Sequence, residues 1–241
     1  MKRLLLGTAL VLVMSAQGNA VTLTTANIGD SGVGTFNGIV DGTVIPGLTA
    51  SIQFTLDSVN TTTNTWFFSY DVTNTSSGLI DASRITAFGF NTVPTLTNST
   101  SITGTVFDTV ELNQNIPQLG MRDFCATTGN CQGGGSGGDG VQKVDTSSGT
   151  FALDFLNGTL LTSITLDDFF VRYQGIDSAV LGFNGESGVG VTPPTGVPFC
   201  TVQPCTPVAV PGPIVGAGLP GLIGACFALL GLARWRRRQS A

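Results

Sequence analysis

Histidine is absent from this 241-residue sequence, and charged residues make up only 10% of it. Without histidine the chain lacks the commonest general base and metal ligand, which excludes every Ser–His and Cys–His nucleophile arrangement. The one adjacent pair of carboxylates is Asp167 and Asp168. Successive residues of a strand point to opposite faces, so we expect these two not to share a substrate and one of them to face Arg172. The sequence therefore predicts a protein that is not an enzyme and uses no cofactor.

Basic residues are scarce between the two ends of the chain. Residues 21–207 hold all fifteen acidic residues against four basic ones, Arg84, Arg122, Lys143 and Arg172, and so carry a net charge of −11. Such a segment repels nucleic acid phosphates and anionic lipids, so neither is an expected partner. Soluble domains usually have about 25% charged residues. Here Thr, Ser, Asn and Gly solvate the chain instead, a composition typical of extracellular β-proteins.

The N-terminus has the parts of a secretory signal peptide. Two basic residues precede an apolar run over residues 4–14, which is too short to span a bilayer comfortably. Gly18 and Ala20 then provide small side chains at the third and first positions before a signal peptidase cut. We expect the Sec machinery to export the chain and signal peptidase to remove residues 1–20 by cleavage after Ala20.

Alternation of apolar and polar residues dominates from residue 21 to about residue 183. In SIQFTLD, Ile52, Phe54 and Leu56 alternate with polar neighbours, as in a half-buried antiparallel strand. NTWFFSYDVTN and GTFALDF repeat the pattern, and turn-forming stretches separate such segments. No stretch between the two ends carries a helical period. The sequence therefore predicts an all-β fold, an antiparallel β-sandwich of eight or nine strands that forms one domain over residues 21–185.

Two irregular stretches interrupt or follow the predicted strands. Residues 125–148 are expected to form a glycine-rich loop, and residues 186–209 an extended Pro/Gly-rich linker. The loop lacks the Gly-Lys-Ser/Thr ending of a phosphate-binding loop. Residues 134–142 fit one copy of the calcium-binding nonapeptide with Asp139 as ligand, but that site forms between stacked neighbouring turns and there is no second copy. An exposed loop without a metal is the favoured interpretation.

Four of the five cysteines form two close pairs, Cys125 with Cys131 and Cys200 with Cys205. An exported protein meets an oxidising compartment in which such pairs persist as disulfides, so we predict two bridges that pin local loops. A four-cysteine zinc site is the alternative, but the spacings are poor for zinc and histidine is absent. Cys226 lies in the terminal apolar run and is expected to be a small apolar filler.

Aromatic residues offer one further hypothesis. Exposed rings on one sheet face would form a platform for the apolar faces of sugars, and this is the basis of a carbohydrate-binding alternative. The alternating positions of these rings are equally those of a packed core, which is the favoured interpretation for most of them. The candidates are Trp66, Phe67, Phe68, Tyr70, Phe169, Phe170 and Tyr173.

The C-terminus combines an apolar span with a basic end. Residues 214–233 are twenty uncharged residues, which as a helix would measure about 30 Å, the thickness of a bilayer core. Basic residues stay on the cytoplasmic side, so a transmembrane helix here places residues 234–241 inside and the β-domain outside. The stop-transfer cluster of the basic tail consists of Arg234, Arg236, Arg237 and Arg238. A permanent single-pass anchor and a transient sorting signal both fit this pattern.

Residues 210–241 resemble the PEP-CTERM sorting signal of Gram-negative bacteria. Pro211, Gly212 and Pro213 stand where that family has Pro-Glu-Pro, within a motif at residues 210–213, and an AGLPGL run, the apolar span and the arginine cluster follow. The resemblance implies an exosortase, a membrane cysteine peptidase, as processing partner. The exosortase would cut near the proline motif and pass the protein from the inner membrane to the cell surface or extracellular matrix. The resemblance also implies an association with exopolysaccharide and biofilm.

A second resemblance covers the segment before this signal. FGFNTVP at residues 88–94, the glycine-rich loop, and LDDFFVRYQGI at residues 166–176 are similar to the cistern family of PEP-CTERM proteins. This resemblance implies no catalytic residues. We therefore expect an exported, non-enzymatic protein of the cell surface or extracellular matrix. The alternative is a carbohydrate-binding module that engages exopolysaccharide.

Overall fold

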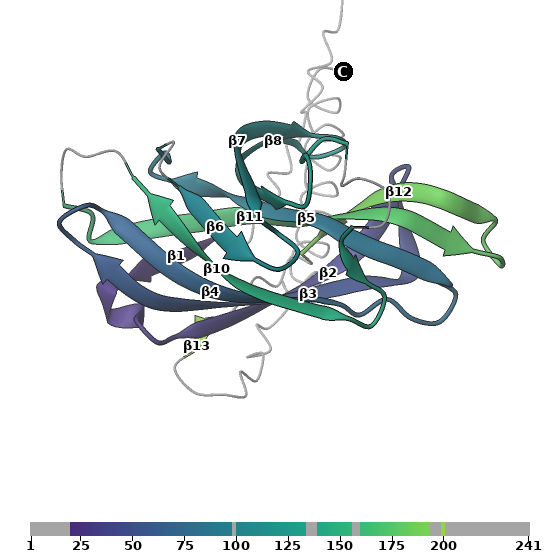
Figure 1. Cartoon of the computed structure of the whole chain (residues 1–241), viewed down its shortest axis with the longest axis horizontal. Coiled ribbons are helices and arrows are strands. Elements are labelled where there is room, and N and C mark those ends of the chain that lie inside the picture. The colour runs from purple at the N-terminus through teal and green to yellow at the C-terminus, as the bar shows by residue number, and fades with distance from the viewer. Residues whose placement is uncertain (1–19, 98–99, 134–138, 156–159, 193–198, 201–241) are drawn as a thin grey trace, which may run out of the picture. The chain divides into compact units, whose positions relative to one another are not determined.

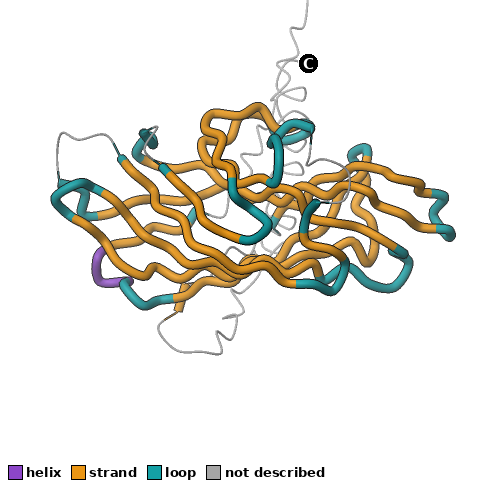
Figure 2. Tube along the Cα trace, viewed as in Figure 1, coloured by secondary structure: helices purple, strands orange, loops and turns teal. Residues whose placement is uncertain are grey.

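A computed structural model describes residues 20–97, 100–133, 139–155, 160–192 and 199–200. Within these ranges the chain forms thirteen strands and one short 3₁₀ helix, η1 (Thr25–Asn27). Figures 1 and 2 show how these elements are arranged. The strands are β1 (Val21–Thr24), β2 (Ser31–Val40), β3 (Thr43–Asn60), β4 (Thr65–Asn74), β5 (Ala82–Val93), β6 (Ser101–Gly104), β7 (Thr109–Ile116), β8 (Gly120–Thr127), β9 (Val141–Gln142), β10 (Thr146–Asp154), β11 (Ser163–Ser178), β12 (Phe183–Val191) and β13 (Phe199–Cys200).

All strand pairs are antiparallel and belong to one hydrogen-bonded sheet. The strands follow the order β6-β10-β4-β3-β2-β12-β11-β5-β8-β7, and the short strands β1, β9 and β13 pair with β11, β5 and β2. The predicted all-β antiparallel fold is confirmed. The sheet is sandwich-like, because one half, β6-β10-β4-β3-β2, faces the other half, β11-β5-β8-β7. Strand β12 pairs with both β11 and β2 and so joins the two halves into a single sheet. The number of strands exceeds the expected eight or nine because several are too short to show a period.

Alternation along β3 and β4 places one face of the hairpin in the core. Ile52, Phe54 and Leu56 are buried in β3, as predicted. In the adjacent strand, Trp66, Phe68, Tyr70 and Val72 are also buried. Phe54 lies opposite Tyr70 in the register.

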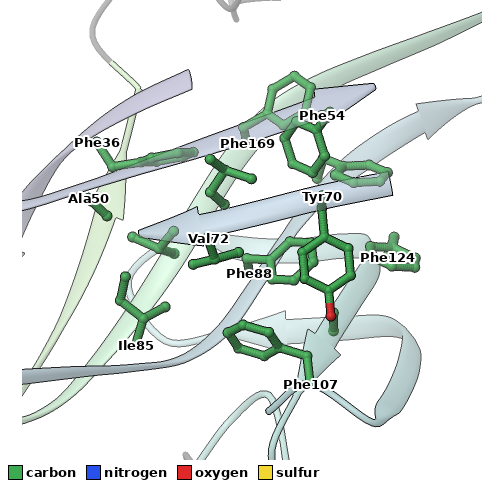
Figure 3. Packing of buried hydrophobic residues seen from close by; sticks show 14 of the residues in the cluster. Phe36, Ala50, Phe54, Tyr70, Val72, Ile85, Phe88, Phe107, Phe124 and Phe169 are labelled. Carbon is green, nitrogen blue, oxygen red and sulfur yellow. The ribbon is translucent and has the colours of Figure 1, made fainter. Parts of the chain in front are cut away.

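Aromatic side chains fill the space between the two halves of the sheet. Phe54 of β3 has ring-centroid distances of 5.7 Å to Phe169 of β11 and 6.1 Å to both Phe88 and Phe90 of β5. Phe151 of β10 lies 6.0 Å from the same ring. Figure 3 shows the Phe54 ring beside Phe169 and the Tyr70 ring beside Phe88. Such pairs contribute roughly 0.5–1.5 kcal/mol each beyond their buried area, so this cluster holds the two halves together.

A smaller cluster forms away from this core, where β7 and β8 meet the outer side of β5, β11 and β12. Phe170 of β11 packs there with Ala87 and Val189 from the neighbouring strands, together with Ile116 and Leu119 at the β7–β8 turn. Consecutive residues point to opposite faces of a strand, so Phe169 enters the main core and Phe170 enters this cluster. The turn end of the hairpin thus packs against the outer side of the sheet, while Phe124 of β8 belongs to the main core.

Two predicted boundaries are corrected by the structure. β12 continues to Val191 and β13 pairs with β2, so the domain extends beyond residue 185 into the expected linker. The expected loop 125–148 begins within β8, contains β9 and ends within β10, because backbone pairing with β5 and β4 extends into its flanks. Residues 1–19 and 201–241 lie outside the described ranges. In the part of the chain that the structure describes, no helix has the length and apolar character needed to cross a bilayer.

Candidate functional site

Most residues of the predicted sorting and processing signals lie outside the described ranges. This applies to Pro211, Gly212 and Pro213, to the transmembrane helix at 214–233 and to the arginine cluster that follows it. Ala20, the expected cleavage position, is described: it is exposed and immediately precedes β1. The sorting signal and both cleavage sites stay predictions.

One of the two expected disulfides is confirmed. Cys125 in β8 and Cys131 after it are bridged, with a Cα–Cα distance of 6.3 Å, and both cysteines are fully buried in the smaller cluster. Glu111 of β7 accepts a hydrogen bond of 2.9 Å from the backbone N–H of Cys131. The bridge therefore pins the segment after β8 against the β7–β8 hairpin. Cys200 is the last residue of β13 and Cys205 lies outside the described residues, so the second bridge stays a prediction.

Replacing both Cys125 and Cys131 with alanine is expected to lower the free energy of unfolding by about 2–3 kcal/mol. Closing so short a loop stabilises by roughly 2 kcal/mol in the chain-entropy model, and two buried sulfur atoms are also lost from a packed cluster. Urea unfolding of the oxidised wild type and the double variant measures the difference. Equal midpoints and slopes for the two proteins would contradict a stabilising role for this bridge.

The glycine-rich segment does not add a metal site to the described structure. Residues 134–138 of the nonapeptide lie outside the described ranges, while Val141 and Gln142 form β9 and pair with β5. Among the residues that are described, no group of three His, Cys, Asp or Glu side chains is arranged to hold a metal ion.

The Asp167–Asp168 pair is arranged differently from the expectation. A β-bulge breaks the alternation of β11 here, with Asp168 at φ 49°, so both flanking apolar residues are buried and neither carboxyl enters the core. Burial raises the pKa of Asp167, and the nearby carboxylates of Asp168 and Asp123 raise it further, while Arg122 lowers it. The cation beside this pair is thus Arg122 of β8 and not Arg172. Strict alternation was the wrong premise, because a bulge inserts an extra residue.

Hydrogen bonds around this bulge join three strands. Asn91 of β5 donates to the Asp168 carboxylate at 3.1 Å, and its side-chain oxygen accepts from the Asp123 N–H at 3.2 Å. Arg122 donates from Nε to the Asp168 carbonyl at 3.2 Å and from Nη1 to the Leu119 carbonyl at 2.9 Å. These contacts hold the β7–β8 hairpin onto β5 and β11, which is a structural task.

The structure separates the aromatic candidates clearly. Phe67 of β4 is 39% exposed, whereas its neighbours in sequence are fully buried. The favoured core interpretation is confirmed for the other six, which are Trp66, Phe68, Tyr70, Phe169, Phe170 and Tyr173. The hypothesis of a broad platform of exposed rings is therefore wrong, and Phe67 is the one exposed ring among the seven candidates.

Phe67 stands on an outward face that is mostly polar. Across β3, β4, β10 and β6 the register aligns Ser58, Phe67, Ala152 and Ser101 in one row. The next row aligns hydroxyl residues from the same four strands. We call this surface the hydroxyl face and define it by Asp57, Ser58, Phe67, Ser69, Asp71, Ser101, Thr103, Ser148, Thr150 and Ala152.

A groove of about 350 Å³ runs over the hydroxyl face beside Phe67. Its lining includes Asp57 and Ser58 from β3, and hydroxyl residues of β6 and β10. Thr103 and Thr150 share a hydrogen bond of 3.1 Å across these two strands. Ser69 donates to the Asp57 carboxylate at 3.0 Å, which orders the acidic edge of the groove. The arrangement suits a hydroxylated ligand, because one apolar ring is flanked by several donors and acceptors.

A second groove of about 360 Å³ lies between the β2–β3 turn and the β7–β8 turn. Ile39, Leu119 and Val189 supply its apolar walls, with Asp41 and Gln118 at the turns. This groove contains one carboxylate and no aromatic ring, so the hydroxyl face is the stronger candidate site.

Sequence reasoning found Phe67 but missed the hydroxyl residues around it. The sequence pattern that could have indicated these residues is the set of polar positions in each alternating segment, such as Ser69 and Asp71 in β4. Alternation does not show which strands are neighbours, and β10 lies between β4 and β6 although it follows both in sequence. Comparisons of the chain with protein-family models, curated proteins and solved structures found no match.

Proposed function

We propose that this chain is an exported, non-enzymatic protein of the cell surface or extracellular matrix of a Gram-negative bacterium. The observation that carries the proposal is the buried Cys125–Cys131 disulfide in an all-β domain. Disulfides persist in oxidising compartments outside the cytosol, and cytosolic thiols are kept reduced. The disulfide supports the export that the first twenty residues predict.

The proposed route has two processing steps. The Sec machinery exports the chain and signal peptidase cuts after Ala20, just before β1. The apolar span at 214–233 then holds the protein in the inner membrane with its arginine tail inside. An exosortase cuts near Pro211 and Pro213, and the domain moves to the surface or matrix, in association with exopolysaccharide and biofilm. These residues carry the proposal through their sequence pattern and their resemblance to the PEP-CTERM signal.

Mass spectrometry of the protein from cells that carry an exosortase tests this route. The mature chain is expected to begin at Val21 and to end near residues 211–213, because the peptidases remove both flanking signals. Replacing Pro211 and Pro213 with alanine is expected to prevent cleavage, so that the C-terminal tail stays attached. Pro207→Ala, in the segment just upstream, is the matched control and is expected to be processed normally.

Two outcomes would contradict the processing step or the whole route. An intact tail in wild-type membrane fractions would mean a permanent single-pass anchor. A folded cytosolic protein with both ends uncut would overturn export itself.

A second function is favoured by one observation of the described domain. Phe67 is an exposed ring within a groove lined by hydroxyl and carboxylate groups, which is the chemistry of a carbohydrate-binding module. We propose this binding role as the alternative to a purely structural one.

A further inference from the structure

We propose that the hydroxyl face binds a neutral polysaccharide, with one sugar ring stacked on Phe67 and the chain lying across β3, β4, β10 and β6. The proposal rests on the carbohydrate-binding function given above and identifies its site and the kind of glycan. The aligned row of Ser58, Phe67, Ala152 and Ser101 spans four neighbouring strands. At about 4.8 Å between strands, this row is roughly 14 Å long, which is room for more than one sugar ring.

Phe67 is the group that a sugar ring would cover. A pyranose ring has an apolar C–H face, and placing it on an exposed aromatic ring removes both surfaces from water. Phe67 is 39% exposed, while the flanking Trp66 and Phe68 are held in the core. The buried neighbours fix the backbone of β4, so the ring is presented on a rigid strand. Ala152, the cross-strand neighbour on β10, is small and leaves the groove open on that side.

The groups around Phe67 match the hydroxyls of a sugar. Each Ser or Thr hydroxyl has one donor and two acceptor sites, and a carboxylate has about four acceptor sites. Asp57 accepts one hydrogen bond from Ser69, and Asp71 accepts one from Ser148, which leaves acceptor capacity on both carboxylates. Sugar hydroxyls donate to such carboxylates and accept from Ser and Thr.

Charge on this face selects a neutral ligand. Asp57 and Asp71 are both exposed, and β3, β4, β6 and β10 contain no Lys or Arg. An anionic polysaccharide would bring carboxylates or sulfates to two like charges with no cation on these strands to pair with them. The domain as a whole is acidic, which adds to this repulsion.

Affinity electrophoresis of the exported protein tests the site. Native gels contain dextran, a β-glucan, a galactomannan or anionic alginate, and the shift in mobility with polysaccharide concentration yields a Kd. At least one neutral polymer is expected to retard the wild type, and alginate is expected to retard it less. Phe67→Ala is expected to raise the Kd about tenfold or more, as for the loss of a central aromatic contact. Phe67→Tyr keeps the ring and is expected to keep the binding.

Val180→Ala is the matched control, because Val180 is an exposed apolar side chain in the turn between β11 and β12. It is expected to leave the Kd unchanged. Wild-type binding that Phe67→Ala does not weaken would overturn this site while leaving carbohydrate binding in place. Failure of all four polymers to retard the wild type would overturn both, and the export route would still be judged by mass spectrometry. Tighter binding of alginate than of every neutral polymer would overturn the charge argument.

Discussion

Phe54→Ala is expected to lower the free energy of unfolding by about 3–5 kcal/mol, the largest effect of any single substitution considered for this domain. Phe54 is 1% exposed and contacts Phe88, Phe90 and Phe169 from the opposite half of the sheet. Alanine would leave a cavity between the two halves and remove these ring contacts together. Urea unfolding followed by tryptophan fluorescence measures the change, because Trp66 is buried in the same core.

Phe67→Ala is the matched control for this measurement. Both residues are phenylalanines on neighbouring strands, but Phe67 faces the groove and Phe54 faces the core. Exposed substitutions usually change stability by less than about 0.5 kcal/mol. Similar losses for the two variants would mean that the ring cluster does not join the halves of the sheet.

Asn74→Leu is expected to cost about 3 kcal/mol. Asn74 is fully buried at the end of β4, and its amide donates to the carbonyls of Ser83 in β5 and Val141 in β9 at 3.1 Å each. Its side-chain oxygen also accepts from the Ser76 N–H at 3.2 Å. Leucine has a similar volume but no polar atoms, so buried carbonyl and N–H groups would lose their partner, at roughly 1–3 kcal/mol each.

The same substitution at an exposed site separates this effect from a general cost of added apolar surface. Asn115 lies exposed in β7, and Asn115→Leu is expected to change stability by less than about 0.5 kcal/mol. Thermal unfolding by circular dichroism compares the two variants. An Asn74→Leu protein as stable as the wild type would show that the two amide hydrogen bonds do not tie β4 to β5 and β9.

The core faces of β3, β4 and β10 were predictable because alternation is a local property. Phe54 and its neighbours at every second position are buried as the pattern indicates. The Cys125–Cys131 bridge was predictable for the same reason, since its two cysteines are six positions apart in sequence. The bulge at Asp168 was not, because a local pattern does not reveal where pairing with β5 and β12 inserts an extra residue.

Gly89, in the FGF stretch of β5, shows at a single position what the local sequence does and does not reveal. The sequence shows only that Gly89 interrupts two aromatic residues of a strand. In the fold, a Cβ atom on Gly89 would lie 2.0 Å from the Phe124 carbonyl oxygen of β8, so glycine is needed for the close pairing of β5 and β8. This requirement depends on a residue 35 positions away in sequence and is not visible in the motif.

Residues close along the chain were enough to predict an antiparallel β domain and the apolar sides of β3, β4 and β10, because both are local properties of the sequence. Tertiary structure alone decided that the two halves form one sheet and that β10 lies between β4 and β6. It also decided that Phe67, out of seven candidate rings, is the one that faces a groove. Strand pairing and packing join residues far apart in sequence, so the burial of a side chain is settled only when those partners meet.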